Sequence, residues 1–338
     1  MALKVGVIGT GMIGKDHIRR LTRVLSGSTV VAVTDVDVEM AKAAAASIPG
    51  GALVHPDGQA LINDSDVDAI VVCSWGPTHE EYVLASIAAG KPVFCEKPLA
   101  TTQDACLRIL EAEVGTGRRL VQVGYMRRYD AAYRALKSSV DTGTIGLPLM
   151  MHCTHRNPSV PGYYDSDSLI TDTAVHEIDM VRWLFGEEIV ATAVLSPRQS
   201  RNGGDLPDPI ILLLETASGI LVDVEISVNI RYGYDIRGEV VGENGTAALG
   251  EASPVTLRIN GGILNQVPTD WRERFIRAYD VEFQEWIDAV RAGGELGPSS
   301  WDGYAAAVVS DAALEARRTN TWVTVQLAGR PSLYASST

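Results

Sequence analysis

The first 125 residues of the chain alternate short apolar runs with Ala-rich segments. The apolar runs that we expect to be strands are residues 3–8, 29–34, 69–74, 92–95 and 120–124. The segments that fit helices between them are residues 14–25, 39–47, 79–89 and 104–115. Strands that are apolar throughout and alternate with helices are typical of a parallel sheet covered on both faces. The pattern therefore predicts a doubly wound α/β domain.

After residue 145 the chain changes to longer runs in which apolar and polar residues alternate. The run Ile220–Arg231 has an apolar set and a largely polar set, namely Val222, Val224, Ile226, Val228 and Ile230 against Leu221, Asp223, Glu225, Ser227, Asn229 and Arg231. One apolar and one polar face is typical of an antiparallel sheet that packs on one side. Turn-forming residues separate such runs at Ser218-Gly219, Asn244-Gly245 and Asn260-Gly261-Gly262.

Helices complete this second region. One ends at Gly186, a typical C-terminal cap, and two more span residues 273–292 and 301–318, followed by a short strand at 321–327. We therefore expect an α/β protein with two domains. Residues 1–124 hold the parallel sheet, and residues 125–338 form an α+β domain on a large, mostly antiparallel open sheet. A chain of 338 residues is long enough for two cores.

Composition argues against several classes of protein. The formal net charge of -13, without any basic stripe, argues against a nucleic-acid partner. Cys73, Cys95, Cys106 and Cys153 lack the spacing of a metal finger, so we expect reduced, mostly buried thiols and no bound metal. No apolar run approaches membrane-spanning length, and the first strand begins too early to leave room for a leader. We expect a cytoplasmic protein without a membrane partner.

A glycine-rich segment predicts a nucleotide site. Gly9-Thr10-Gly11-Met12-Ile13-Gly14 follows the first expected strand and opens the first expected helix. There the glycines permit a tight turn and a close approach of the backbone to a pyrophosphate, which the helix N-terminus faces. Asp35 ends the second strand, where a carboxylate accepts ribose hydroxyls and repels a 2′-phosphate. We expect a Rossmann domain that prefers NAD to NADP; the alternative for Asp35 is a simple turn former.

Glu96-Lys97-Pro98 follows the strand at residues 92–95, at the carboxyl edge where open α/β sheets bind ligands. Lys97 can donate to a substrate oxygen and stabilise negative charge on it. Pro98 can fix the loop, conceivably through a cis bond. The alternative is an ordinary solvated lysine in a loop.

The segment Asp172–Asp179 holds a candidate base. Helical spacing would place Asp172 and Asp179 beside His176. A histidine oriented by a carboxylate can accept a proton near neutral pH, as the oxidation of an alcohol requires. We expect Asp172 to be its partner and Asp179 to be supporting. The alternative is an exposed polar helix face with an ordinary histidine.

Two further segments suit a ligand made of hydroxyls. In the run Leu149–Asn157 alternation places His155 and Asn157 on one face, with Met151 and Cys153. Tyr232 and Tyr234 also share a face, whichever way it points. The alternatives are polar residues at a strand end and core aromatics that use their hydroxyl once.

Gly9–Gly14, Glu96-Lys97-Pro98 and the Asp172/His176 pair together resemble the glucose-fructose oxidoreductase/inositol dehydrogenase (Gfo/Idh/MocA) family over essentially the whole chain. Further segments are similar to its inositol 2-dehydrogenase subgroup, namely Ser74–Glu80, Gly124–Asp130, His155–Pro158 and Arg231–Ile236. The resemblance implies a Rossmann domain followed by a domain for substrate binding and oligomerisation. It also implies an NAD-dependent oxidation of a cyclitol in inositol catabolism, by a homo-oligomer such as a homotetramer.

The resemblance also implies residue roles. The catalytic group is Lys97, Asp172 and His176. The residues along the cofactor, with the fingerprint and Asp35 included, are Gly9, Gly11, Met12, Ile13, Gly14, Asp35, Ser74, Trp75, His79, Glu96, Lys97, Met126 and Arg127. The residues around the substrate are Lys97, Arg127, His155, Asn157, Asp172, His176 and Tyr234. By its residue type alone, Trp75 is instead interpreted as a packing residue, like Trp271.

These roles predict a mechanism. His176 takes a hydroxyl proton while hydride leaves the same carbon for NAD, Asp172 orients the imidazole, and Lys97 stabilises the oxygen. The product would be the 2-keto-inositol. The alternatives are a dehydrogenase of another sugar or sugar derivative and a catalytically silent NAD-binding regulator. Which inositol isomer reacts, and whether the loop at residues 158–171 closes over it, stay open.

Overall fold

The computed structural model describes residues 2–250 and 255–335. The chain forms two compact units. Unit 1 comprises residues 1–125, 279–307 and 328–338, and unit 2 comprises residues 126–278 and 308–327. The first boundary lies next to the one expected at residue 124. The two later segments of unit 1 fall within the stretch that the sequence pattern assigned to the second domain.

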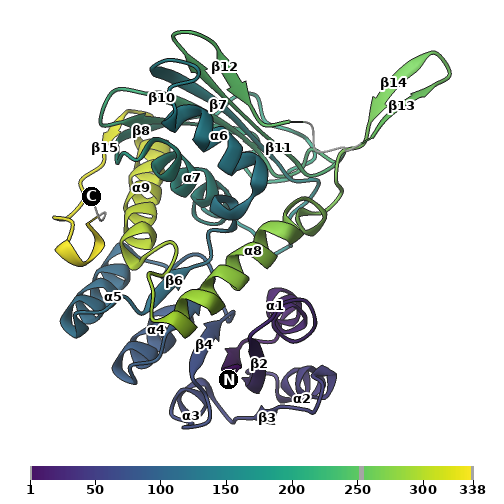
Figure 1. Cartoon of the computed structure of the whole chain (residues 1–338). Helices are drawn as coiled ribbons and strands as arrows, with labels where there is room; N and C mark the ends of the chain where they lie inside the picture. The colour runs from purple at the N-terminus through teal and green to yellow at the C-terminus, as the bar shows by residue number, and fades with distance from the viewer. Residues whose placement is uncertain (1, 251–254, 336–338) are drawn as a thin grey trace. The chain divides into compact units, whose positions relative to one another are not determined.

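Unit 1 is built on a six-stranded parallel sheet in the order β3-β2-β1-β4-β5-β6 (Figure 1). Its strands are β1 (Leu3–Ile8), β2 (Ser28–Thr34), β3 (Leu53–Val54), β4 (Ala69–Val72), β5 (Val93–Cys95) and β6 (Val121–Val123). Its connecting helices are α1 (Met12–Arg23), α2 (Val38–Ser47), α3 (Gly58–Ile62), η1 (Gly76–Thr78), α4 (His79–Ala88) and α5 (Gln103–Thr116). The order reverses between β1 and β4, which confirms the doubly wound Rossmann arrangement.

The strand β3 and the helix α3 of unit 1 have no counterpart in the expected pattern. β3 is a two-residue edge strand, and its Leu53 is largely exposed. α3 has five residues and begins at Asp57, whose side chain accepts the N–H of Ala60. Elements this short bury too few residues to leave a periodic hydrophobic signal.

The core of unit 1 includes a segment from late in the chain. Val5, Val7 and Val71 of the sheet are fully buried. The second half of α8 (Trp271–Ala292), which belongs to unit 1, adds Phe283 and Trp286 to the same cluster. Burying a Phe side chain stabilises a fold by about 1.5–3 kcal/mol. The C-terminal segment is therefore part of the fold of unit 1.

Unit 2 is built on a seven-stranded sheet in the order β12-β11-β7-β10-β9-β8-β15. Its strands are β7 (Pro148–Arg156), β8 (Ile189–Leu195), β9 (Ile210–Thr216), β10 (Leu221–Ser227), β11 (Asp235–Gly242), β12 (Thr246–Ala248) and β15 (Val323–Thr324). Among the described pairs only β10 with β7 is parallel, which confirms a mostly antiparallel sheet. Val222, Val224 and Ile226 are fully buried, as the alternation predicts.

Two strands are shorter than expected. β10 ends at Ser227. At Arg231 the backbone is no longer extended, because its φ of 68° lies in the left-handed region. Of the strand expected at 321–327, only Val323–Thr324 pairs with a neighbour. Alternation of residue types does not reveal such an interruption.

The helices of unit 2 include α6 (Ala131–Asp141) and α7 (Val175–Phe185), which lie side by side on one side of the sheet (Figure 1). The turn η2 (Met126–Tyr129) precedes α6, and the second part of α9 (Ser300–Thr319) also belongs to this unit. α7 ends at Gly186 with a φ of 67°, which confirms the expected cap.

A two-stranded hairpin, β13 (Thr256–Ile259) with β14 (Gly262–Asn265), also belongs to unit 2 (Figure 1). Its turn has φ values of 51° at Asn260 and 75° at Gly261. Two central residues with positive φ are typical of the tight hairpin turn that the sequence predicted there. The 3-10 turn η4 (Ser332–Tyr334) is the last described element.

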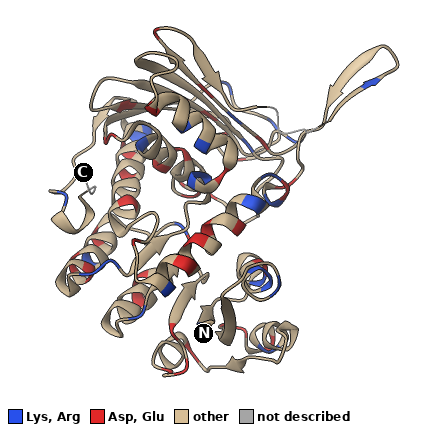
Figure 2. Cartoon of the chain, viewed as in Figure 1, with Lys and Arg blue, Asp and Glu red and all other residues tan. Residues whose placement is uncertain are grey.

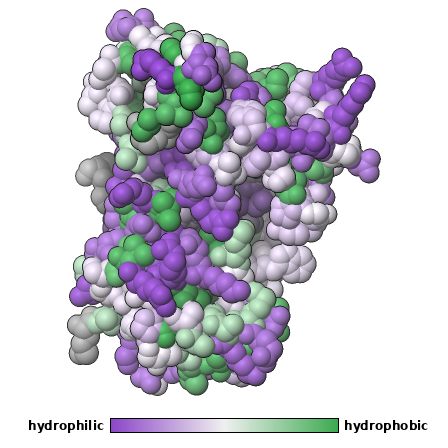
Figure 3. Space-filling model, turned by 90° about the vertical axis from the view of Figure 1, so that its right-hand side faces the viewer, coloured by the Kyte–Doolittle hydropathy of each residue, from purple (hydrophilic) through white to green (hydrophobic). Residues whose placement is uncertain are grey.

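The surface combines both kinds of charge. Figure 2 shows acidic and basic residues interspersed along α8. The face seen in Figure 3 likewise mixes hydrophilic and hydrophobic residues. No described helix combines the length and the apolar content needed to cross a membrane. Cys73, Cys95, Cys106 and Cys153 are free and buried, as expected.

Candidate active site

The glycine-rich segment forms the turn between β1 and α1. Gly9 has a φ of 92°, and a Cβ there would lie 2.6 Å from the backbone of Cys73. A Cβ at Gly14 would lie 2.0 Å from the carbonyl oxygen of Gly9. Around Gly11, by contrast, no described atom lies within 4 Å of an added Cβ. The fold itself requires Gly9 and Gly14, whereas Gly11 keeps open the surface that a pyrophosphate would approach.

The N-terminus of α1 suits an anion. The helix begins at Met12 with Gly11 as its N-cap, and neither a capping side chain nor an acidic residue occupies its first described turn. The first N–H groups of a helix and its dipole attract negative charge. Met12 is exposed and Ile13 packs against the core, so the expected cofactor-binding residues lie on both sides of this helix start.

Asp35 lies just after β2 and is tied to the glycine-rich turn. Its Oδ2 accepts the backbone N–H of Thr10 at 2.6 Å and the hydroxyl of Thr10 at 3.0 Å. Its Oδ1 accepts the backbone N–H of Asp37 at 3.0 Å. These bonds fix the carboxylate beside the turn. The residues present fit a dinucleotide, and the ribose contact of Asp35 stays a prediction.

The loops after β4 and β5 are joined through His79. Its Nδ1 lies 2.7 Å from the carbonyl oxygen of Pro98, and its Nε2 lies 2.9 Å from that of Ser74. Burial lowers the pKa of His79, although both carbonyls favour the protonated ring. The Lys97–Pro98 bond is cis, the form that the sequence left open for Pro98. His79 therefore holds together two loops that carry expected cofactor residues.

Trp75, in the first of these loops, is 79% exposed. The interpretation of Trp75 as a packing residue is therefore wrong. The loop after β4 turns outward at this position, into the η1 turn, and the residue type alone does not show this. A contact of Trp75 with the cofactor stays a prediction.

Glu96 immediately follows β5, at the carboxyl edge of the sheet, and is buried. Its Oε1 lies 2.6 Å from Nε2 of His17, on α1. Sequence reasoning missed His17. It also missed Arg20, whose Nη1 lies 2.7 Å from Nδ1 of His17. Their spacing of three residues on one helix was the only sequence signal for this pair.

In unit 2, Asp172 lies in a π-helical segment, η3 (Leu169–Ala174). The regular helix α7 begins only at Val175, so the expectation of regular α-helical spacing from Asp172 to His176 is wrong. Part of a wider, π-helical turn lies between them, and such turns are frequent at functional sites. His176 is 9% exposed.

Asp179, on α7, is buried and bound to Arg128. Arg128 Nε donates to Asp179 Oδ2 at 2.9 Å, and its Nη2 donates to Oδ1. Two parallel bonds of this kind fix both groups. Asp179 therefore anchors α7 to the η2 turn, which agrees with a supporting role.

A buried cluster joins Arg127, Glu177 and His155. Arg127 Nη1 donates to Glu177 Oε1, and Arg127 Nη2 lies 3.1 Å from Nδ1 of His155. The same Nδ1 lies 3.0 Å from Glu177 Oε2. Burial would raise the pKa of Glu177, but Arg127 and His155 together hold it below its ordinary value. Sequence reasoning missed Glu177, whose only signal was its place next to His176.

His155 connects this cluster to the candidate base. It lies on the buried face of β7 with Met151 and Cys153, as alternation predicted. Its ring centroid is 6.4 Å from that of His176. Asn157 lies just beyond β7, where its backbone bonds Ser227 and Ile230. The structure thus brings two of the expected substrate residues of unit 2 together.

The two tyrosines do not share a face. Tyr234 is buried and meets the ring of His155 edge-on at 5.9 Å, and burial raises its pKa to about 12. Tyr232 is 48% exposed, and its hydroxyl accepts from Arg156 and donates to Asp235. The expectation of a common face is wrong because both tyrosines precede β11, outside any strand.

Other expected residues are placed as follows. Met126 is buried at the start of η2. In the loop at residues 158–171, Tyr163 is exposed, whereas the hydroxyl of Tyr164 lies 2.6 Å from that of Thr173. Within residues 2–250 and 255–335, no group of three His, Cys, Asp or Glu could hold a metal ion.

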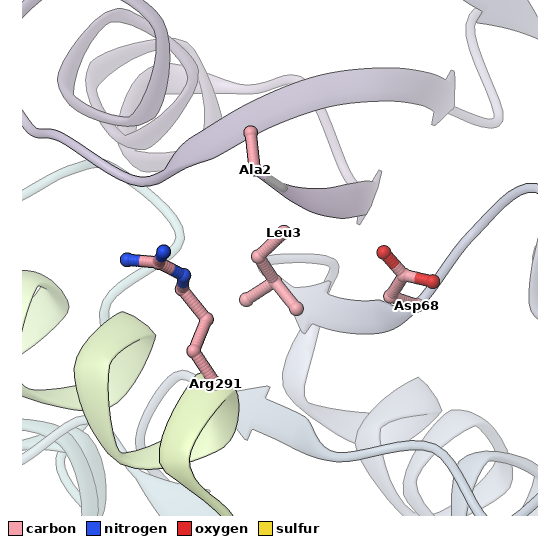
Figure 4. A pocket seen from close by; sticks show the side chains of 4 residues that line it. All are labelled: Ala2, Leu3, Asp68 and Arg291. Carbon is pink, nitrogen blue, oxygen red and sulfur yellow. The ribbon is translucent and has the colours of Figure 1, made fainter.

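A pocket of about 300 Å³ in unit 1 lies away from these groups (Figure 4). It is lined by Ala2, Leu3, Asp68 and Arg291. Leu3 begins β1 and Asp68 immediately precedes β4, so the pocket lies at the amino edge of the sheet. Open α/β sheets bind ligands at the opposite, carboxyl edge.

Two family models match the chain. The model described as "Oxidoreductase family, NAD-binding Rossmann fold" matches residues 3–125, and "Oxidoreductase family, C-terminal alpha/beta domain" matches residues 137–325. Both describe the Gfo/Idh/MocA family. Together they cover both parts of the chain in the expected order.

Individual relatives agree with these models. The chain is 56% identical to an inositol 2-dehydrogenase of Pseudomonas syringae pv. syringae over 336 residues, which cover 99% of this chain and 100% of that protein. It is 54% identical to an inositol 2-dehydrogenase of Burkholderia vietnamiensis over 99% of each chain. Among solved structures, it resembles a myo-inositol dehydrogenase from Lactobacillus casei in complex with NAD(H) and myo-inositol. The TM-score is 0.96 at 43% identity, covering 99% of this chain and 100% of that one. The chain belongs to the Gfo/Idh/MocA oxidoreductase family.

Proposed function

We propose that this protein is an NAD-dependent inositol 2-dehydrogenase. It transfers hydride from a ring CH–OH of myo-inositol, or of a close isomer, to NAD and releases the 2-keto-inositol. The full-length match to an enzyme solved with NAD(H) and myo-inositol carries this proposal. The alternative, a dehydrogenase of another sugar or sugar derivative, shares the same fold and chemistry.

Unit 1 supplies all of the expected cofactor residues except Met126 and Arg127, which belong to unit 2. The open surface at Gly11 and the uncapped start of α1 would hold the pyrophosphate, and Asp35 would accept the ribose hydroxyls. The remaining expected contacts are Met12, Ile13, Ser74, Trp75, His79, Glu96, Lys97, Met126 and Arg127. When bound, NAD supplies the acceptor for hydride. Asp35 is held rigidly by Thr10, so a 2′-phosphate would meet a carboxylate that cannot swing away.

Proton transfer is assigned to unit 2. His176, as a neutral imidazole, takes the proton of the hydroxyl that is oxidised. Asp172 orients that imidazole and stabilises its charged form. Lys97, on the cofactor unit, donates to the same oxygen and stabilises its negative charge. Intact candidate residues for all three roles argue against a silent NAD-binding regulator.

Substrate binding is assigned to His155, Asn157, Tyr234 and Arg127. The 6.4 Å between the rings of His155 and His176 supports a shared ligand within unit 2. Arg127 is held by Glu177 and His155, so its role toward the ligand includes fixing the ring of His155. A hydroxyl can both donate and accept, which suits an imidazole and an amide as partners.

We further infer a homo-oligomer, a homotetramer in line with the family resemblance, that works in inositol catabolism in the cytoplasm. Four buried free thiols agree with a reducing compartment. Light scattering on the purified protein measures its mass directly. The mass of a single chain, 36.2 kDa, would contradict the oligomer.

A panel of cyclitols and aldoses tests the activity itself. Purified protein is mixed with NAD and each polyol, and NADH formation is followed by its absorbance. We expect myo-inositol or a close isomer to have the highest kcat/KM. Faster oxidation of an aldose would favour the sugar dehydrogenase, and absence of turnover on every polyol would favour the silent regulator.

A further inference from the structure

A buried polar group connects the nucleotide-binding helix to the loop of Lys97. His17 and Arg20 on α1 are both 0% exposed. Arg20 donates through Nη2 to Asp16 at 2.8 Å and through Nε to Asp280, on the unit 1 part of α8, at 2.7 Å. Its remaining nitrogen, Nη1, lies 2.7 Å from Nδ1 of His17. The guanidinium is thus fixed on three sides.

This arrangement selects one tautomer of His17. A guanidinium only donates, so Nδ1 of His17 accepts from Arg20 and carries no proton. The proton of the neutral ring is therefore on Nε2, which donates to Glu96 Oε1 at 2.6 Å. Burial lowers the pKa of His17, against the opposing effect of Glu96, so the ring is neutral at neutral pH.

The second carboxylate oxygen of Glu96 contacts the backbone of the next residue, Lys97. Glu96 Oε2 accepts the backbone N–H of Lys97 at 3.3 Å. Gly124 borders the same oxygen, and a Cβ there would lie only 3.2 Å from it. The carboxylate is therefore confined between His17, the start of the Lys97 loop and the bare backbone of Gly124.

Aromatic rings surround this contact. The ring centroid of Phe283 lies 4.4 Å from that of His17. The ring of Phe94 meets the ring of His17 edge-on, with 6.1 Å between the centroids. In such apolar surroundings a hydrogen bond is stronger than in water, and a buried polar group that lacks its hydrogen bond destabilises the fold more. The position of Glu96 is thus determined by His17 rather than by solvent.

We propose that His17 is a positioning residue for the dehydrogenase reaction, because it fixes Glu96 and, through Glu96, the backbone from which Lys97 reaches the substrate oxygen. The proposal rests on the proposed function of Lys97. It assigns to α1 a second task besides cofactor binding. A misplacement of about 1 Å in such a loop can lower turnover about a hundredfold.

The test compares four variants of the full-length protein with myo-inositol and NAD. His17→Leu removes the N–H donor, and His17→Gln returns one near the place of Nε2. His55→Leu is the matched control, because His55 makes the same kind of contact with Asp64, at 2.9 Å, in the same unit. Lys97→Ala measures the full value of the lysine.

We expect His17→Leu to lower kcat about tenfold to a hundredfold while the KM for NAD changes by less than about threefold. His17→Gln should restore most of kcat, and His55→Leu should keep wild-type kinetics. A wild-type kcat in His17→Leu, or equal losses in the Leu and Gln variants, would overturn the proposal. If Lys97→Ala is impaired and His17→Leu is not, only the positioning role of His17 is contradicted. If Lys97→Ala keeps full turnover, both the proposed role of Lys97 and the positioning role of His17 are contradicted.

Two measurements keep the test valid should His17→Leu not fold. In Gly124→Ala the added Cβ would lie 3.2 Å from Glu96 Oε2 and 3.2 Å from the ring of Phe94, so it crowds Glu96 from the opposite side. We expect a lower kcat with an unchanged KM for NAD; wild-type turnover would contradict the proposal. Nitrogen NMR of the histidine-labelled protein without NAD should show His17 protonated on Nε2 only. A proton on Nδ1 would overturn the proposed contact with Glu96.

Discussion

Among the residues that the structure describes, each unit has a buried group of a histidine, a glutamate and an arginine, and the two groups differ in how the histidine is held. In unit 1, His17 uses Nδ1 for Arg20 and Nε2 for Glu96. In unit 2, Arg127 and Glu177 both approach Nδ1 of His155, at 3.1 Å and 3.0 Å.

The difference indicates different tasks. A donor at one nitrogen and an acceptor at the other leave His17 a single tautomer, which suits a ring that fixes other groups. A nitrogen shared by a donor and an acceptor allows either tautomer, so the second nitrogen of His155 can donate to a hydroxyl or accept from one. Such a ring suits a polyol, whose hydroxyls do both.

The largest effect is expected at His176, next to the His155 group. His176→Ala removes the proposed base and should lower kcat by about a hundredfold or more, because a positioned general base contributes at least that much. NAD binding, measured by NADH fluorescence, should be unchanged. Near-normal turnover would remove His176 from the role of base.

Glu177→Gln tests the unit 2 group directly. The amide keeps the shape but loses the charge that holds Arg127, and its N–H competes with Arg127 for Nδ1 of His155. We expect the KM for myo-inositol to rise about tenfold, because the Nδ1 contacts that orient the ring of His155 are changed. The KM for NAD should change little. A change confined to the KM for NAD would assign Glu177 to the cofactor instead.

Asp35→Ser perturbs unit 1 at the cofactor and leaves both histidine groups intact. Removing a carboxylate that opposes a 2′-phosphate should reduce the preference for NAD over NADP by about tenfold. The ratio of kcat/KM for the two cofactors measures it. An unchanged ratio would mean that the ribose is recognised elsewhere.

The smallest effect concerns stability against pH. Burial lowers the pKa of His17 below its ordinary value of 6.5, so below that pH the unfolded chain binds a proton that the native state does not. The free energy of unfolding should therefore fall as pH drops below about 6.5, by up to about 1.4 kcal/mol per pH unit from this residue. Denaturant unfolding of His17→Gln should show a flatter pH dependence. An identical slope in both proteins would argue against a neutral His17.

The two groups also show what a sequence reveals. The turn at Gly9–Gly14, Asp35 and the parallel sheet follow from local patterns, because each depends on residues close together in the chain. His17 and Glu96 are 79 residues apart, and Arg127 and Glu177 are 50 apart, so neither pair leaves a local signal. Local pattern also failed where the backbone departs from regular geometry, at the π-helical turn of Asp172 and at Arg231 before Tyr232.

The central claim is that hydride leaves the inositol ring for NAD. Myo-inositol with deuterium on carbon 2 tests it directly, with mass spectrometry of the reduced cofactor after oxidation by the purified protein. We predict that the deuterium appears in NADH and that oxidation is slower than with unlabelled myo-inositol. Unlabelled NADH formed at the same rate would contradict hydride transfer from carbon 2.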